Sequence, residues 1–463
     1  MATRNIDAGS NSQRLNGGSG GNRFFNFNEG PDEPAIRRVY AAFEVPDPDE
    51  NGAIDNEEAV PKESVQLECI DVAWFDSAQR EGRPWAEIYV SAPLGVLELN
   101  SNLLPPLPQE FLPGQIAWFT LTVFPDSGAA VSQGRFYSNL FSDGYPVMVE
   151  FLGPREPGWA GKGPLGDGRW FRTSYAKDIV SDANLTMPAL RDALDGANHN
   201  DGVAVYDVGQ GACQAVVHGE ALLPALYIDF GGGVLGNAKT FPADFRGFCF
   251  SMSPSIVLSH WDWDHWSSAY RHLAALKAKW ITPEIPEKPI QQAFAAHLHS
   301  LGNLLIWTKA VPSSVKFGSV RVERCTGRTV NDSGLAVTVY PSPTRRKNVL
   351  LPGDANYRHI PSVLAGAAFT SLSMTHHGGR LHSKVIPKAR RGGTVVCSVG
   401  AGNSYKHPFL ETYSAHTAAG WQHTFQTGMT GPRPSHVYLP WDEKPSMFRG
   451  GCLKGSCSVV NYS

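Results

Sequence analysis

A short segment of the chain concentrates side chains that bind metal ions. In the segment Ser259–His265, four potential ligands lie within six residues: His260, Asp262, Asp264 and His265. Burying these polar side chains without partners would cost several kcal/mol, and a divalent cation that they coordinate would remove that cost. The segment therefore predicts a metal site, and the alternative is an exposed polar loop.

Further candidate ligands follow later in the chain, whereas the first 198 residues contain no histidine. Asp354 follows a glycine, which permits a close backbone approach, so its carboxylate is a candidate bridge between two metals. His376 and His377 are adjacent, and on an extended segment their side chains would point to opposite sides, so only one is expected to ligate. His407 is a candidate late ligand or proton donor to a leaving group.

A two-metal site indicates hydrolysis. Two metals lower the pKa of a bridging water, supply hydroxide at neutral pH and stabilise charge on the attacking and leaving oxygens. This chemistry suits phosphodiester cleavage, while amide, thioester and lactam hydrolysis stay open. Asp264, Asp354 and His407 are the residues expected to take part in catalysis.

The order of these motifs resembles the metallo-β-lactamase superfamily. The metal motif of that family is His-x-His-x-Asp-His, and here Asp262 takes the place of the second histidine, a variant similar to the soluble ComEC-like hydrolases. The resemblance continues in order through the segments Asp207–Gly211, Ile228–Gly233, Asn331–Ser333, Leu351–Asp354, His376–Gly378, Ser398–Asn403 and Tyr405–Pro408. The chain departs from the pattern at Gly379, where relatives usually carry serine, and in an insert from Pro283 to about Gly327.

The resemblance implies an αββα sandwich with two divalent metal ions at one edge. The carboxylate of Asp262 makes the ligand set harder, so zinc and manganese are expected about equally and magnesium less. Asp207 and Asp229 are candidates for holding ligand side chains from behind. Three polar residues are candidates for substrate contact, or for ordinary turns and caps: Asn331, Ser333 and Asn403.

The resemblance also implies a nucleic-acid phosphodiester as the substrate, and hence a DNase. Local features that fit this are basic clusters at Arg345–Lys347 and Lys388–Arg391, and tryptophans that could stack bases, Trp261, Trp263 and Trp266. The alternatives are a solvated surface for the basic clusters and a packed wall of the site for the tryptophans. Two other functions stay open: hydrolysis of a small phosphodiester, such as a cyclic nucleotide or phosphocholine ester, and a binding module with a non-catalytic metal site.

The elements around these residues indicate a mixed α/β second half. Branched apolar runs predict strands at Val203–Val208, Leu226–Asp229, Ser255–Leu258, Ala336–Tyr340, Asn348–Leu351 and Thr394–Ser398. Helical spacing predicts helices at Met187–Leu194 and Ser267–Trp280. Earlier runs predict strands at Val65–Val72, Ile116–Val123 and Pro146–Phe151. We therefore expect a flexible tail over 1–30, a β-rich accessory or recognition domain over 31–185 and the hydrolase domain over 196–463.

The composition bounds the possible partners. A net charge of −3 argues against a globally basic nucleic-acid binder. No apolar run approaches the ~20 residues that span a bilayer, and the polar N-terminus has no signal-peptide core. With seven cysteines that fit reduced thiols, these features indicate a cytoplasmic protein. Because an unrestrained nuclease would endanger its host, we expect a regulatory protein partner, as in a bacterial antiviral defence system.

One motif in the first half stands apart from this site. Asp47–Glu58 satisfies the pattern of an EF-hand calcium loop, with Gly52 at the sixth place. Pro61 would interrupt the exit helix that such a loop requires, so an acidic hairpin loop is the alternative.

Overall fold

The computed structural model describes residues 23–25, 34–46, 64–105, 111–126, 132–154, 182–245, 247–341, 347–429 and 433–453. The calcium-loop candidate Asp47–Glu58, most of the expected tail and the first two residues of the Arg345–Lys347 cluster lie outside these ranges. In the parts of the chain so described, no helix has both the length and the apolar character needed to cross a membrane.

The first half forms a closed β-barrel, which confirms the expected β-rich character. Its strands pair in the order β1-β2-β3-β5-β6-β4. They are β1 (Arg37–Glu44), β2 (Ser64–Asp71), β3 (Leu94–Asn100), β4 (Ile116–Pro125), β5 (Gly134–Tyr137) and β6 (Tyr145–Pro154). Alternate residues point inward, so Leu97, Leu99 and Phe136 share the apolar interior while their neighbours face outward.

Two helices that the sequence analysis missed lie between β2 and β3, namely α2 (Val72–Arg80) and α3 (Trp85–Ser91). The expected strand Val65–Val72 stops at Asp71 because the carboxylate of Asp71 accepts the N–H of Trp74 at 2.8 Å. That bond caps the first turn of α2 and makes Val72 helical.

The second half contains two sheets, which confirms the mixed α/β class. The eight-stranded sheet has the order β12-β11-β10-β9-β8-β7-β20-β21. Its strands are β7 (Gly202–Val205), β8 (Gln214–His218), β9 (Leu223–Ile228), β10 (Ser255–Val257), β11 (Trp280–Thr282), β12 (Leu304–Ile306), β20 (His436–Pro440) and β21 (Ser446–Phe448).

The seven-stranded sheet runs from β13 to β19 in chain order. Its strands are β13 (Ser314–Phe317), β14 (Val320–Arg324), β15 (Leu335–Val339), β16 (Val349–Leu351), β17 (Ala368–Ser373), β18 (Lys388–Cys397) and β19 (His423–Gln426). An apolar core between the sheets joins Ile228 and Val257 of one sheet to Val337, Leu351 and Val396 of the other. Strands buried on both faces read as continuous branched runs, which explains why the sequence located them.

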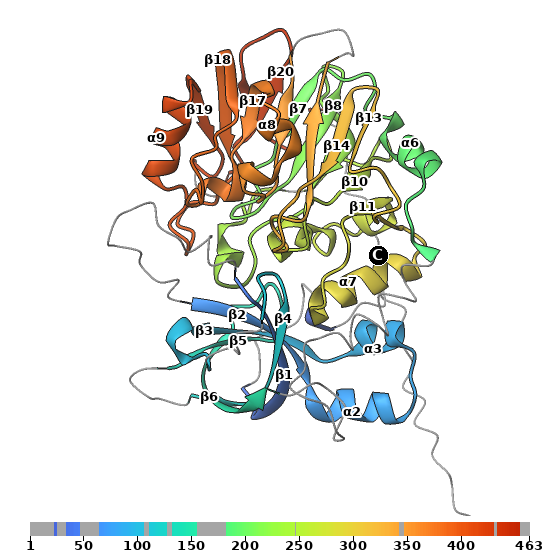
Figure 1. The fold of residues 1–463 in the computed structure, drawn as a ribbon, viewed down its shortest axis with the longest axis vertical. Coiled ribbons are helices and arrows are strands. Elements are labelled where there is room, and N and C mark those ends of the chain that lie inside the picture. Colours follow the sequence, from blue (N-terminus) through green and yellow to red (C-terminus); the bar gives the residue numbers. More distant parts are fainter. Residues whose placement is uncertain are drawn as a thin grey trace, which may run out of the picture.

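Helices cover the outer faces of the two sheets. Helix α7 (Pro289–Ser300) packs Phe294 and Leu298 into the core outside the first sheet. Helices α8 (Pro361–Leu364) and α9 (Leu410–Ala418) lie outside the second sheet, with Val363 in the core there. Helix α6 (Met187–Asp195) forms where the sequence predicted a helix, capped by the side chain of Thr186. Figure 1 shows α7 between these sheets and the barrel.

The predicted helix Ser267–Trp280 is wrong. The segment forms two short 3-10 turns, Ser267–Ala269 and Leu273–Lys277, separated by His272 in a non-helical conformation. Trp280 instead begins β11, which pairs in parallel with β10. Apolar residues at helical spacing fit successive 3-10 turns as well, so the pattern alone could not separate the two.

Several strands of the two sheets end at one common edge. Strands β9 and β10 are parallel to each other, as are β16, β17 and β18. Parallel strands bring their carboxyl ends to the same side of a sheet, where polar side chains can gather. The candidate residues follow these ends: Asp229, His260, Asp354, His377 and Ser398.

Candidate metal centre

His260 follows β10 and presents a buried nitrogen that has no hydrogen-bond partner. Its Nδ1 lies 3.0 Å from Ser259 Oγ. Its Nε2 lies 3.5 Å from Asp262 Oδ2 and 3.9 Å from Asp354 Oδ2, and it makes no hydrogen bond. A buried, unpaired imidazole nitrogen is costly unless a cation binds to it, so His260 fits the role of a metal ligand.

His265 is held from behind by Asp229. The Nδ1 of His265 donates to Asp229 Oδ2 at 2.8 Å, and the carboxylate also accepts Ser259 N–H at 2.6 Å. This bond fixes the ring and leaves Nε2 directed at the other candidates. Although burial favours the neutral ring, the carboxylates of Asp354 and Asp229 raise the pKa of His265 well above its ordinary value.

His377 enters the cluster from a backbone that is not extended. His376 and His377 have φ values of 50° and 53°, in the left-handed region, and Gly378 continues the turn. The Nδ1 of His377 donates to the carbonyl of Ser398 at 2.9 Å, and its Nε2 lies 3.3 Å from Asp264 Oδ2. The assumption of an extended segment is therefore wrong. His376 is not among the residues whose ligand atoms converge; its ring lies 5.7 Å from that of His407, and its charge helps to lower the pKa of Asp354.

Asp354 lies at the centre of the group. The turn before it has Gly353 at φ 59°, where any Cβ would collide with Ser259. The carboxylate Oδ1 lies 3.1 Å from His265 Nε2 and 3.6 Å from His377 Nε2. Against burial, the charges of the neighbouring histidines lower the pKa of Asp354 well below its ordinary value.

The candidate ligands form two overlapping groups, His260 with His265 and Asp354, and Asp264 with His265 and His377, whose ligand atoms lie within 4.8 Å of one another. The two Nε2 atoms of His265 and His377 face each other at 3.3 Å. Since each ring uses Nδ1 elsewhere, both Nε2 atoms point into the group, where a cation could replace the protons that the nearby carboxylates favour on these rings. The buried group could therefore hold a metal ion.

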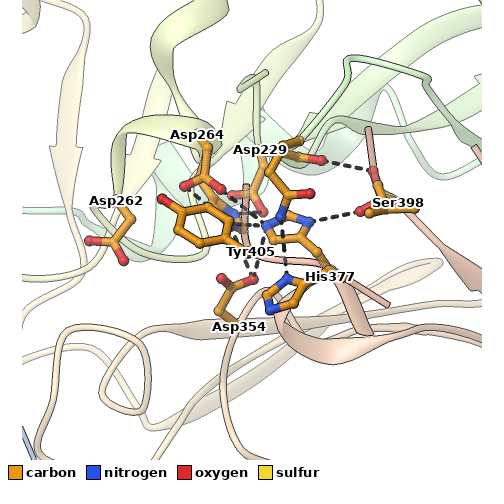
Figure 2. Close-up of polar contacts among 12 residues, drawn as sticks. Asp229, Asp262, Asp264, Asp354, His377, Ser398 and Tyr405 are labelled. Atoms are coloured by element: carbon orange, nitrogen blue, oxygen red, sulfur yellow. Dashed lines mark hydrogen bonds and ion pairs between the residues drawn. The ribbon is translucent and has the colours of Figure 1, made fainter. Parts of the chain in front are cut away.

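One side of the group stays accessible. The side chains of Asp262 and Asp264 are 36% and 21% exposed, whereas the histidines are buried. Figure 2 shows Asp262 at the margin of the cluster and the ring of Tyr405 beside Asp264. A substrate would approach from this side.

His407 and Asn403 belong to one loop beside the cluster. Asn403 donates to the carbonyls of Gly400 and His407 and accepts His407 N–H at 3.0 Å, so its side chain folds this loop and is not available to substrate. His407 Nδ1 lies 3.4 Å from Gln210 Nε2. Burial and the neighbouring His376 and His377 lower the pKa of His407 to about 3. Its role as a proton donor stays a prediction.

Asp207, Asn331 and Ser333 lie outside the group. Asp207 accepts the backbone N–H groups of Gly209 and Ser435, so it joins the end of β7 to the start of β20 and holds no candidate ligand. Asn331 and Ser333 lie in a loop that meets the end of β10, where Leu335 N–H donates to the carbonyl of Ser259. Their contact with substrate stays a prediction.

The structure removes the support that the three tryptophans and the Lys388–Arg391 cluster gave to base stacking and polyanion binding. All three tryptophans are buried, and Trp266 stacks on Phe294 of α7 with ring centroids 4.2 Å apart, so they pack the wall of the site. The Lys388–Arg391 cluster begins β18, whereas the site lies after the other end of that strand. Six to nine residues of the strand separate them, roughly 20–30 Å.

Sequence reasoning missed two residues at the exposed side of the cluster. Tyr405 lies in a segment that the family resemblance had already marked, and its position before His407 was the available signal. Gln66 of the barrel donates to the Tyr405 hydroxyl at 3.5 Å, and nothing in the sequence links residues so far apart. No family model matches this chain, and no curated protein matches its sequence.

Proposed function

We propose that the protein is a metal-dependent phosphodiester hydrolase of the metallo-β-lactamase type. The observation that carries the proposal is the convergence of histidines and aspartates from separate strand ends on one point, with His260 Nε2 left unpaired. The layering of helices outside two facing sheets supports an αββα assignment. The bound group would be two zinc or manganese ions.

Some of these residues would bind the metals, and others would orient the ligand side chains. His260, Asp262, Asp264, His265, Asp354 and His377 would hold the metals, with Asp354 between them; we call these six the metal cluster. When bound, divalent metals supply activated water and neutralise charge on phosphoryl oxygens. Asp229 and the carbonyl of Ser398 orient two of the imidazoles, and the exposed carboxylates of Asp262 and Asp264 face the approaching ester.

A nuclease is the first form of this proposal, and a small-diester hydrolase is the second. The nuclease form rests on the ComEC-like motif order. The burial of the tryptophans and the remote position of Lys388–Arg391 favour the second form, because neither feature is then needed. A regulatory protein partner on the barrel would be compatible with either.

The test is metal analysis together with hydrolysis by the wild type and Asp264→Ala. The wild type purified with zinc or manganese should retain metal and hydrolyse bis-p-nitrophenyl phosphate. Asp264→Ala should lose at least about 100-fold of that rate, since even residues behind a ligand contribute 10- to 100-fold. Asp192→Ala, an exposed aspartate on α6, is the matched control. A metal-loaded wild type that hydrolyses no phosphodiester would leave a binding module as the better reading.

A further inference from the structure

The barrel stands directly over the exposed side of the metal cluster. Residues that alternate outward on β2, β3 and β5 point toward the second half, and we call Gln66, Glu98 and Tyr137 the barrel wall. Gln66 donates to the Tyr405 hydroxyl, and Tyr137 donates to Glu98 at 3.0 Å. Burial raises the pKa of the Tyr405 hydroxyl, and the nearby carboxylates of Asp264 and Glu98 raise it further. Tyr405 therefore lies between the wall and the candidate ligands.

The barrel wall is fixed in place by contacts between the barrel and the second half, on both sides of the space over the metal cluster, which we call the gap. Glu68, also on β2, accepts the N–H of Ile290 in the first turn of α7 at 2.8 Å. Glu44 on β1 lies 3.4 Å from Lys288 and accepts Val330 N–H at 2.7 Å. These buried polar contacts attach the barrel to the second half, so the wall is not a loosely tethered module.

A second attachment lies on the other side of the wall. The guanidinium of Arg271 lies over Phe141 of the barrel and over Phe241 of the second half, at 4.4 Å and 4.3 Å from the ring centroids. Leu235 N–H donates to the carbonyl of Leu140 at 2.8 Å. With attachments on both sides, the barrel wall is held at a fixed position relative to the metal cluster.

The gap is too narrow for a double helix. A double helix is wide: its major groove alone is about 12 Å across, and its phosphates lie on the outside. Here the two sides are already joined by a 3.5 Å contact between Gln66 and Tyr405, beside Asp264. A duplex laid across the metal cluster would collide with the barrel, whereas an unpaired strand or a small ester presents a single, narrower phosphodiester chain.

The surface beside the gap suits unpaired bases. Tyr405 is 42% exposed, and its ring is followed along the loop by those of His407 and Phe409, with centroids 5.6 Å and 5.4 Å apart in succession. Arg380 lies over Phe409 at 5.1 Å. Aromatic rings in sequence with an arginine are typical of sites that stack single-stranded bases.

We infer that the barrel wall and Tyr405 restrict the site to phosphodiesters without a paired strand. Gln66 and Tyr405 are then specificity-determining residues. The inference rests on the proposed phosphodiester hydrolysis and adds the class of substrate. Its two sources, an unpaired nucleic-acid strand and a small diester, share the chemistry and are separated by the choice of substrate below.

The experiment compares three substrates: bis-p-nitrophenyl phosphate, a single-stranded oligonucleotide and a covalently closed duplex plasmid. The wild type should show kcat/KM for the single strand at least about tenfold above that for the plasmid. Gln66→Ala should reduce this ratio about threefold or more, the equivalent of one neutral hydrogen bond. Tyr405→Phe, which keeps the ring and removes the hydroxyl, should shift the ratio in the same direction. Gln422→Ala, an exposed glutamine beyond α9, should not.

The possible failures are distinguishable. Equal rates on single strand and plasmid, or a ratio unchanged in both Gln66→Ala and Tyr405→Phe, would overturn the inference and leave the hydrolase proposal intact. Hydrolysis of the small diester with neither polymer cleaved would keep the restriction and identify a small ester as the source. If nothing is hydrolysed, the proposed function is wrong. Fluorescence anisotropy then still decides the inference, since the Asp264→Ala protein should bind a labelled single strand more tightly than its duplex.

Discussion

Two clusters of ionisable side chains lie next to each other, and they differ in the source of their positive charge. The metal cluster contains acids and imidazoles, with no lysine or arginine among them. The neighbouring lysine cluster contains Glu44, Glu68 and Lys288, and the ammonium of Lys288 lies 3.4 Å from Glu44. Against burial, Glu44 and Asp262 raise the pKa of Lys288, which keeps it charged. The second cluster carries its own cation, and the first needs one from solution.

The pairing of atoms shows the same difference. In the lysine cluster, Glu44 and Glu68 each accept a backbone N–H in addition to their attraction to Lys288. Each cluster contains one buried atom without a hydrogen bond, Glu68 Oε1 in the lysine cluster and His260 Nε2 in the metal cluster. Only in the metal cluster do two imidazole nitrogens also face each other, which indicates that a cation belongs there.

The largest effect should come from removing the central carboxylate of the metal cluster. Asp354→Ala should lose bound metal and at least about 100-fold of phosphodiesterase activity, because its carboxylate lies within 3.9 Å of all three histidines of the group. EDTA should lower the melting temperature of the wild type and leave that of Asp354→Ala unchanged, because only the wild type has bound metal to lose. Metal analysis and calorimetry measure both. If Asp354→Ala retained its full metal content, the claim that only the metal cluster needs a cation from solution would be wrong.

The lysine cluster should respond in stability and not in metal content. Lys288→Met leaves two buried carboxylates without their cation and should lower the free energy of unfolding by about 3 kcal/mol. Adding Glu44→Gln should recover part of this loss, and Lys309→Met, an exposed lysine, should have no effect. Urea unfolding of metal-loaded protein measures the change. Loss of metal from a folded Lys288→Met protein would show that the two clusters are one site.

A smaller effect on metal binding is expected from changing Asp229, which accepts a hydrogen bond from His265. Asp229→Asn keeps the shape but removes the charge that fixes the imidazole, so metal affinity should fall about 10- to 100-fold. Competition with a metal-binding dye measures the dissociation constant. Asp244→Asn, an exposed aspartate, is the control. Unchanged affinity would mean that Asp229 serves only to hold Ser259.

The two clusters also differ in how far the sequence predicts them. His260 to His265 are neighbours in the chain, so their convergence follows from one turn after a strand. The lysine cluster joins residues 44, 68 and 288: pairing of β1 with β2 brings Glu44 near Glu68, and packing of the barrel against the start of α7 adds Lys288. No local pattern reports such a distant meeting.

Errors within the second half have a similar origin. His376 and His377 look extended in sequence, but a left-handed turn stabilised by the bond from His377 to Ser398 redirects them. The tryptophans pack the wall of the site, which was one of the two alternatives left open by the sequence, and the side chain of Asn403 bonds to backbone groups of its own loop. Residue type and strand position were predictable, while orientation depended on tertiary contacts.

The smallest effect concerns the pH dependence of the lysine cluster. Burial raises the pKa of Glu68 to about 7 from an ordinary 4.5, against the attraction of Lys288. Between pH 4.5 and 7 the folded protein therefore holds a proton that the unfolded chain releases, so stability falls as pH rises through this window. Glu68→Gln should remove this fall, on the order of 1–2 kcal/mol, because its side-chain oxygen can still accept Ile290 N–H.

The comparison is made between urea unfolding curves of the wild type and Glu68→Gln at several pH values from 5 to 8. Other groups also titrate there, including the histidines, so the difference between the two proteins carries the signal. Glu150→Gln, exposed on β6, should run parallel to the wild type. If Glu68→Gln also runs parallel, Glu68 is ionised throughout. The charge of Lys288 would then be enough to keep both carboxylates ionised, although burial favours their neutral forms.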